Sequence, residues 1–352
     1  MLESGVADDW NEVWLPRLRE LCASIRAATR ACLARALGDG APERVARPVG
    51  QGAGDVTYGL DLPSEELCTR WLEETARERP LSLLTEDAGW RHRGPDPTGD
   101  GSVELPGFDH GGPRIALDPV DGTRNLMTDL RPAWTAVGYA PPGAGEPRLA
   151  DLTGGLLSEI PDTRARFWRS LEAATGGGCR FAERPLEGDG AGTERALSAD
   201  GDDRVDHGYF PFFGYMPDLA PELARIEADF FARAAAEEGA DVRNCYDDQY
   251  ISNAGQLALL ALGTYRMIAD LRAWLADRRG RPTITSKPYD VAGAIVCARA
   301  AGCVVTAPGG GALDFPLDAT APVAFVGWHN PATRARLEPH LVAAIARPAS
   351  SP

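Results

Sequence analysis

The segment 115–125, IALDPVDGTRN, ends an apolar run on two aspartates three residues apart, followed by a glycine and a hydroxyl. Pro119 restricts the turn and holds Asp118 and Asp121 on one side of the chain, where their charges repel each other unless a cation lies between them. Hard cations such as Mg²⁺ prefer oxygen ligands, and the Val120 carbonyl can face the same ion. The spacing therefore predicts a metal site.

The two residues behind the acids suit a phosphoryl group. Gly122 and Thr123 are expected to begin the next helix, and the N-terminal amides of a helix attract anions. The formal net charge of −15 cannot provide that attraction. We therefore expect the carboxylates to hold metal and the backbone behind them to hold phosphate.

Haloacid-dehalogenase-type phosphatases offer a competing interpretation, because they also place an aspartate pair before Gly-Thr at a strand end. Their pair is spaced i, i+2 and supplies a nucleophile and a general acid. The i, i+3 spacing of Asp118 and Asp121 moves the second acid off that backbone edge. It favours metal ligation over an aspartyl-phosphate nucleophile.

Three further segments place acids at the end of a strand or the start of a helix: Asp61, Glu86-Asp87 and Asp290. Taken singly, each has an ordinary structural explanation, since acids at strand ends are commonly solvated and Asp290 alone would be a helix N-cap.

Composition limits the classes of function. A chain of 352 residues with 44% hydrophobic and 25% charged residues is long enough for two domains. The negative charge argues against a nucleic acid polymer or an anionic membrane as a partner. The turn-rich segment 187–204 is the candidate boundary, giving an N-terminal α+β domain (1–200) with most of the acids and a C-terminal α/β domain (201–352) with Asp290 and the substrate-side residues.

The seven cysteines are odd in number and form no CxxC pair, which argues against a disulfide framework and a thiolate zinc site. Residues 1–15 lack the pattern of a signal peptide, and no uncharged apolar run is long enough for a membrane span. We expect a cytoplasmic protein.

Hydrophobic periodicity predicts layers of helices and strands rather than a barrel. Segment 88–113 is expected to be a long surface loop with solvent-facing His92 and His110. Ser64 is expected to cap the second helix. The expected helices are 9–38, 64–79, 219–239, 253–268 and 290–302, and the expected strands are 81–87, 114–121, 133–140, 149–160, 303–308 and 321–327.

The segment 208–217, GYFPFFGYMP, contains five aromatic residues in ten. A buried strand and turn is the favoured interpretation. An aromatic platform for a nucleobase or another ring is the alternative.

Three segments in order, LTED, LDPVDGTRN and KPYDVAGAIVCARAAGCVVTAPGG, resemble the signature blocks of the inositol monophosphatase and fructose-1,6-bisphosphatase superfamily of Mg²⁺-dependent, lithium-sensitive-type phosphatases. VTYGLD resembles the block before them. The resemblance spans roughly residues 50–325. It implies a layered α-β-α-β-α sandwich and a homodimer.

The resemblance also implies roles for individual residues. Glu86, Asp118, the Val120 carbonyl, Asp121 and Asp290 would bind two or three Mg²⁺ ions. Thr123, with Glu86, would orient the attacking water, and Asp61 would steady Thr123. Gly122 and Thr123 would bind phosphate, and no covalent phosphoenzyme is implied.

The sequence departs from the family pattern at two places. Thr85-Glu86-Asp87 replaces Gly-Glu-Glu, so Asp87 is expected to reach metal only through water, and Tyr289-Asp290 replaces Trp-Asp. Asp270 and Lys287 are expected to contact the substrate. For Lys287 a solvated loop position is the alternative.

The resemblance implies hydrolysis of a small sugar, cyclitol or inositol phosphate by a metal-activated water. The alternative within the enzyme class is a nucleotide phosphatase, acting on a 3′,5′-bisphosphate or a nucleoside 5′-monophosphate. A non-catalytic protein that binds a phosphate ligand is the alternative from another class.

Overall fold

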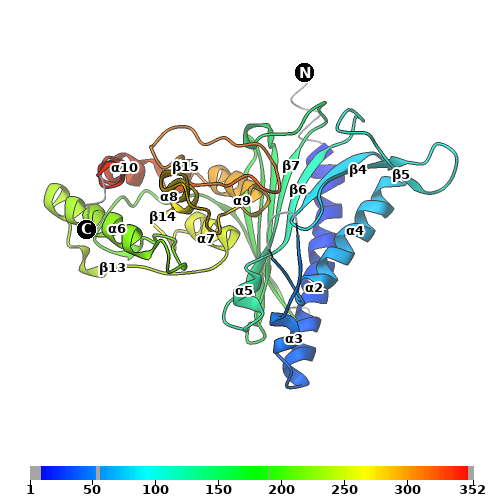
Figure 1. The fold of residues 1–352 in the computed structure, drawn as a ribbon, viewed down its shortest axis with the longest axis horizontal. Coiled ribbons are helices and arrows are strands. Elements are labelled where there is room, and N and C mark those ends of the chain that lie inside the picture. The colour runs from blue at the N-terminus through cyan, green and yellow to red at the C-terminus, as the bar shows by residue number, and fades with distance from the viewer. Residues whose placement is uncertain (1–8, 53–55, 189, 348–352) are drawn as a thin grey trace.

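A nine-stranded sheet lies at the centre of the computed structural model, which describes residues 9–52, 56–188 and 190–347 (Figure 1). The spatial order is β11-β10-β9-β8-β7-β6-β3-β4-β5, and every neighbouring pair is antiparallel except β3 and β6. The strands are β3 (Leu81–Thr85), β4 (Gly89–Pro95), β5 (Ser102–Glu104), β6 (Arg114–Asp121), β7 (Ala133–Ala140), β8 (Gly154–Ile160), β9 (Phe167–Ala174), β10 (Gly178–Pro185) and β11 (Thr193–Leu197).

Two helices, α2 (Leu15–Gly38) and α4 (Leu62–Ala76), cover one face of this sheet. A π-helical turn, η1 (Asp9–Trp14), precedes α2. Leu18 and Ile25 of α2 recur at helical spacing and pack with Leu117 and Leu156 of the sheet. The other face is covered by α7 (Asn253–Ala261) and α9 (Pro288–Ala300), which are apolar almost all round because they are buried between two sheets.

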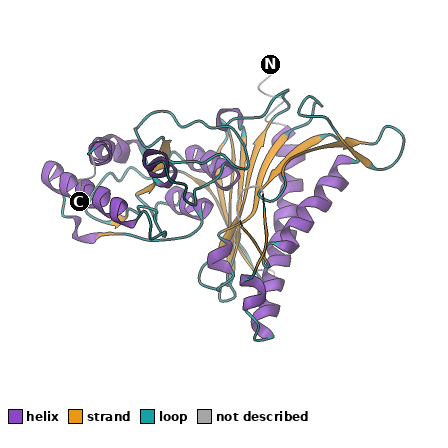
Figure 2. Ribbon diagram, in the orientation of Figure 1, coloured by secondary structure: helices purple, strands orange, loops and turns teal. Residues whose placement is uncertain are grey.

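A second, antiparallel sheet of β14 (Met267–Asp270), β16 (Phe325–Trp328) and β15 (Val304–Thr306) lies beyond α7 and α9, and α6 (Ala220–Glu238) and α10 (Pro331–Ala346) cover its outer face. Figure 2 shows the resulting alternation of helices and strands. The layered α-β-α-β-α fold expected from the sequence is confirmed. The remaining elements are α3 (Glu43–Ala46), α5 (Thr123–Leu126), α8 (Arg272–Arg279), η2 (Leu149–Asp151), η3 (Val242–Asn244), β1 (Pro48–Gln51), β2 (Val56–Tyr58), β12 (Gly208–Tyr209) and β13 (Cys245–Tyr246).

The prediction that residues 88–113 form a surface loop is wrong, because this segment contains β4 and β5, which extend the central sheet. His92 lies in β4 and His110 in the loop between β5 and β6, and both are half-buried rather than solvent-facing. Nδ1 of His92 lies 2.8 Å from the Oγ of Ser82, and Nε2 of His110 lies 2.7 Å from the same atom. The two imidazoles thus share one hydroxyl of β3.

Two predicted helix boundaries are also corrected. The helix predicted over 253–268 ends at Ala261, and Gly263, with φ of 79°, leads into β14. Helix α4 begins at Leu62 with Asp61 at its N-cap position, so Ser64 is not the cap. The Oγ of Ser64 instead donates a hydrogen bond of 2.6 Å to the carbonyl of Asp61.

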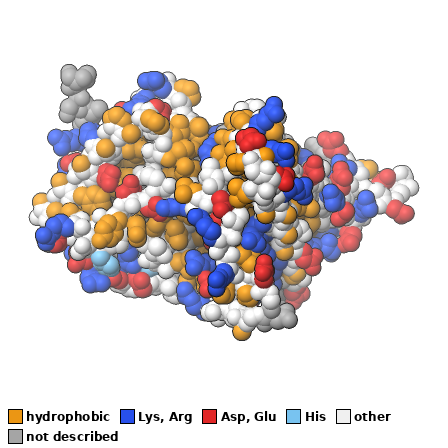
Figure 3. Space-filling view, turned by 90° about the horizontal axis from the view of Figure 1, so that it is seen from below, with side chains coloured by type: hydrophobic (Ala, Val, Ile, Leu, Met, Phe, Trp, Pro, Cys, Tyr) orange, Lys and Arg blue, Asp and Glu red, His pale blue; other side chains and the backbone are white. Residues whose placement is uncertain are grey.

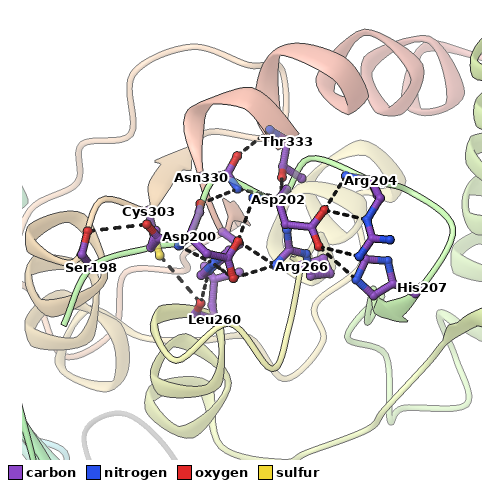
Figure 4. Close-up of polar contacts among 12 residues, drawn as sticks. Ser198, Asp200, Asp202, Arg204, His207, Leu260, Arg266, Cys303, Asn330 and Thr333 are labelled. Atoms are coloured by element: carbon purple, nitrogen blue, oxygen red, sulfur yellow. Dashed lines mark hydrogen bonds and ion pairs between the residues drawn. The ribbon is translucent and has the colours of Figure 1, made fainter.

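The segment that follows β11 is fixed by buried polar side chains (Figure 4). The guanidinium of Arg266, only 3% exposed, bonds the carboxylate of Asp200 and the carbonyl of Asp202. The side-chain amide of Asn330 donates to the same two residues' carbonyls, at 3.0 and 2.8 Å. Leu157, which precedes this segment, and Ile295, which follows it, belong to the same hydrophobic core. The division into two domains at residue 200 stays a prediction.

The face in Figure 3 carries acidic and basic side chains intermingled with hydrophobic ones, so no single-sign surface covers it. All seven cysteines are free thiols. None of the helices in the described part of the chain has the length and apolar character needed to span a membrane.

Candidate active site

The parallel pairing of β3 and β6 brings the first acids together. The carboxyl ends of parallel strands lie at the same sheet edge, and Leu84 is paired with Ala116 near that edge. Glu86 follows β3 directly, while Asp118 and Asp121 end β6, where the ladder with β7 is interrupted between them. All three acids line one pocket of about 70 Å³.

Two helix starts add acids to the same pocket. Asp290 lies in the first turn of α9, where its Oδ2 accepts a hydrogen bond of 2.9 Å from the backbone N–H of Lys287. Asp61 stands at the N-cap position of α4. The pocket is therefore lined by five carboxylates from distant segments: Asp61, Glu86, Asp118, Asp121 and Asp290.

The acids affect one another electrostatically. Burial raises the pKa of Asp118 well above its usual range, and the charges of Asp290, Asp121 and Glu86 raise it further. Burial also raises the pKa of Asp121 to about 6, although hydrogen bonds favour its charged form. Its Oδ2 accepts from the Ser252 hydroxyl at 2.7 Å and from the N–H of Ala254, at the start of α7, at 2.6 Å.

Thr123 contacts Asp61, as predicted, and also the Val120 carbonyl, which was predicted as a metal ligand. Its Oγ1 is 2.7 Å from Oδ1 of Asp61 and 2.9 Å from the carbonyl oxygen of Val120. The second oxygen of Asp61 accepts from the N–H of Tyr58 at 2.8 Å. Burial raises the pKa of Asp61 to about 6.

Gly122 forms the turn that leads from β6 into α5. Its φ of 104° is rarely adopted by residues with side chains, and a Cβ there would lie 3.0 Å from Cβ of Ser252. Both constraints require glycine. Helix α5 is a single turn of four residues, shorter than the helix expected behind the acids. A helix this short has little dipole, so only a few backbone amides are available there to an anion.

Basic side chains share the pocket with the acids. Arg124, Arg272 and Lys287 all line it, and Nζ of Lys287 donates to the carbonyl of Thr320 at 3.0 Å. Arg272 is only 2% exposed, and its guanidinium lies 4.4 Å from the ring centroid of Phe213. Arg272 is not among the residues predicted from the sequence, where the available signal was an arginine two residues after an aspartate at the end of a strand.

Asp270 does not line the pocket. It is fully buried, and its two oxygens accept hydrogen bonds from Nε and Nη2 of Arg272 at 2.9 and 2.7 Å. The hydroxyl of Ser286 donates to it at 2.5 Å. Asp270 is therefore not placed to contact a substrate directly, contrary to the prediction. It affects the pocket only through its ion pair with Arg272, which lines the pocket.

Asp87 also lies outside the pocket lining. Its Oδ1 accepts a hydrogen bond of 2.6 Å from the hydroxyl of Thr57.

The aromatic segment 208–217 is divided between the two roles predicted for it, a buried segment and an aromatic platform in the site. Phe210 and Phe212 are buried in the core beneath α6, whereas Phe213 and Tyr215 line the pocket.

The donor set fits a hard divalent cation. The pocket lining contains carboxylates and the backbone of Val120 but no thiol or imidazole, which favours Mg²⁺ or a similar ion over zinc. The side-chain oxygen of Asn253, buried without a hydrogen-bond partner, also belongs to this lining. As placed, however, no three acidic, histidine or cysteine side chains in the described residues form a compact metal-binding group. A bound cation would have to draw the carboxylates together or be held partly through water.

Solved structures with the same fold include inositol monophosphatases, the type of protein that the sequence resembles. The chain superposes on extragenic suppressor protein SuhB from Bartonella henselae with a TM-score of 0.57 and 18% identity, over 92% of this chain and 98% of that one. For inositol monophosphatase II from Staphylococcus aureus the TM-score is 0.55 at 16% identity, over 95% and 98%. For an inositol monophosphatase–fructose 1,6-bisphosphatase it is 0.56 at 13% identity, over 93% and 99%.

The chain therefore has the same fold as these inositol monophosphatase and SuhB structures. No family model and no curated protein matches the chain by sequence. The likeness thus concerns the arrangement of helices and strands, and the activity has to be argued from the pocket.

Proposed function

We propose that the chain is a Mg²⁺-dependent phosphomonoesterase that hydrolyses a small sugar, cyclitol or inositol phosphate. One observation carries the proposal: acids from four distant chain segments line a single pocket together with a hydrogen-bonded threonine and three basic side chains. Such a mixture suits a ligand that is bound through a cation at its phosphoryl end and through side chains at the other.

In this proposal the ion is held by Glu86, Asp118, Asp121, Asp290 and the Val120 carbonyl. Bound Mg²⁺ supplies Lewis-acid stabilisation of the phosphoryl oxygens and a water of lowered pKa. Glu86 and Asp118 lie at the ends of adjacent strands, and Asp290 lies on α9. An ion bound by all three would therefore draw the sheet edge and the start of α9 together.

The chain's own groups position the reactants. With its hydrogen donated to Asp61, the Thr123 oxygen keeps lone pairs that can accept a hydrogen bond from the attacking water and orient it. The amides of Gly122 and Thr123 can donate to a phosphoryl oxygen. Direct attack by this water needs no aspartyl-phosphate intermediate.

A nucleotide phosphatase is the second candidate. Phe213 and Tyr215 at the pocket favour it, because aromatic rings stack on a base. Both rings already lie near the guanidinium of Arg272, at 4.4 and 5.5 Å. A base would therefore meet an arginine–aromatic stack rather than an open platform, and the sugar or cyclitol phosphate remains the first choice.

The proposal is tested by phosphate release from a panel of sugar, cyclitol and nucleotide phosphates with Mg²⁺ present. We expect turnover of at least one cyclitol or sugar phosphate, and loss of about 10³-fold in kcat for Asp121→Asn. Asp277→Asn, an exposed acid on α8, is the matched control and should retain wild-type rates. Absence of release with every ester would leave the non-catalytic phosphate-binding alternative. Release that is unchanged in Asp121→Asn would show that the acids of this pocket do not carry the reaction.

The remaining expectations are also proposals. We propose a small phosphate ester as the partner of the pocket and a homodimer as the assembly, which light scattering of the purified protein would measure. The division into domains 1–200 and 201–352 can be tested by limited proteolysis near residue 200.

A further inference from the structure

A second pocket, of about 330 Å³, lies between α2 and the strands β8, β9 and β10. It shares no residue with the pocket described above. Helix α2 contributes one face of residues spaced three or four apart, and each strand contributes alternate residues that point to the same side of the sheet. Its lining is Arg19, Glu20, Cys22, Ala23, Arg26, Leu156, Ser158, Trp168, Ser170, Glu172, Arg180 and Arg184.

The hollow has a specific cause in the strand register. Ser158 is paired with Ser170, and Ser170 with Ala182, so three small side chains form one row across the sheet. The next row on one side contains Glu172 paired with Arg180, and the next row on the other side contains Trp168 paired with Arg184. Long side chains thus stand on both sides of a row that cannot fill the space beneath α2.

The pocket carries more positive than negative side chains, in a protein with a net charge of −15. Glu172 accepts from both Arg19, at 2.6 and 2.7 Å, and Arg180, so one carboxylate serves two guanidinium groups. Arg184 pairs with Glu194, which does not line the pocket. The charges of the lining are therefore only partly balanced within it.

The surroundings of Arg26 favour a bound anion. Its guanidinium lies 3.6 Å above the ring of Trp168 and donates a hydrogen bond of 2.8 Å to the hydroxyl of Ser158, and it forms no ion pair within the described residues. Burial lowers the pKa of Arg26 to about 10. The positive charges of Arg30 and Arg184 also lower it, whereas Cys22 and Glu159 act in the opposite direction. A bound anion would offset both penalties.

We propose that this pocket is a binding site for a small organic anion, whose phosphate or carboxylate group is held by Arg26 and Arg184 and whose apolar part lies against Ala23 and Leu156. Arginine suits both oxyanions because its planar donors match their geometry. The volume accommodates a ligand of one ring, at the lower end of small-molecule pockets, which span roughly 300–1,000 Å³. The site is independent of the proposed phosphatase activity.

An arginine that merely stacks on a tryptophan is the competing structural explanation. The chain provides an internal comparison, since Arg278 lies 4.5 Å from the ring of Trp274 on α8 and lines neither pocket. Arg278→Gln is therefore the matched control for Arg26→Gln.

The experiment is calorimetric titration of the full chain in EDTA, so that no divalent cation contributes, with inorganic phosphate, phenylphosphonate, benzoate and neutral phenol as probes. We expect phenylphosphonate or benzoate to bind, the preferred one identifying the oxyanion, and phenol not to bind. Arg26→Gln should weaken binding at least about tenfold. Arg278→Gln and Lys287→Gln should leave it unchanged, the latter showing that the first pocket is not responsible.

Ala23→Phe provides the test that keeps all four arginines, because Ala23 lies on the exposed side of α2 and a larger side chain would fill the hollow. We expect it to abolish binding without a large loss of thermal stability. Equal affinity in wild type, Arg26→Gln and Ala23→Phe, or no binding of either ring-bearing anion at about 10 mM, would overturn the proposal.

Discussion

Oγ1 of Thr123 lies 2.7 Å from Oδ1 of Asp61, although 62 residues separate them in the chain. The contact joins the turn behind the acids of β6 to the start of α4. Because Asp61 is buried and also accepts from the N–H of Tyr58, its carboxylate is fixed before any ligand binds. The orientation of the Thr123 hydroxyl is therefore set by the fold.

This contact predicts strongly non-additive mutations. Thr123→Val and Asp61→Asn should each lower kcat by about 10²- to 10³-fold, because both disturb the orientation of the same hydroxyl. The double variant should be little worse than either single one. Steady-state phosphate release would measure all three rates. Multiplicative losses in the double variant would mean that the two residues act separately.

The turn at Gly122 predicts a steric cost beyond backbone strain. Gly122→Ala should lower the free energy of unfolding by about 2 kcal/mol or more, because positive φ and the close Cβ of Ser252 both oppose a side chain. Gly111 has a φ of 74° but open space around it, so Gly111→Ala measures the backbone strain alone. Urea unfolding of both variants would separate the two contributions. Equal losses of unfolding free energy in the two variants would show that Ser252 moves aside without a free-energy penalty.

The buried pair of Asp270 and Arg272 predicts a loss of stability rather than a simple loss of substrate contact. Asp270→Asn should lower the free energy of unfolding by about 3 kcal/mol, because it leaves a buried guanidinium without its counter-charge. Asp277→Asn should change it by less than about 0.5 kcal/mol. A normal unfolding curve combined with a raised KM would instead support the direct substrate contact.

Glu159 predicts a pH dependence of stability. This side chain is 8% exposed, and burial raises its pKa from 4.5 to about 7. Between these values the folded protein binds the proton more tightly than the unfolded chain, so this contribution is complete below about pH 4.5 and is lost as the pH rises through 7. The loss is on the order of 3 kcal/mol.

Comparison with Glu159→Gln isolates this contribution, since the variant lacks the titrating group. Urea unfolding of the two proteins at several values between pH 4.5 and pH 8 should show the wild type losing stability relative to the variant across that window. A constant difference between the two curves would mean that Glu159 titrates near its ordinary pKa.

The sequence predicted the fold where a local pattern and its environment agreed. The apolar run before Asp118 is a buried strand, and the acids after it lie at the edge that the parallel partner β3 also reaches. Helix α9, expected over 290–302, runs from Pro288 to Ala300, and Gly302, with φ of 95°, gave the signal for its end. These signals are local and need no knowledge of the tertiary structure.

Other features depended on contacts that no local pattern reveals. Segment 88–113 contains many glycines, prolines and aspartates, but pairing with β3 makes part of it strand. Asp270 was predicted as a substrate contact, but both of its carboxylate oxygens accept hydrogen bonds from Arg272. The hollow above Ser170 arises from the register of three strands, which the sequence alone does not give.

The most direct test of the account is calorimetric titration of Mg²⁺ into the full chain. We expect wild type to bind the ion, and Asp118→Asn and Asp290→Asn each to bind it at least about tenfold more weakly, because they remove ligands contributed by different layers. Asp277→Asn should bind like the wild type. Unchanged binding in both pocket variants, or no Mg²⁺ binding by the wild type, would contradict the claim that these distant carboxylates form one metal site.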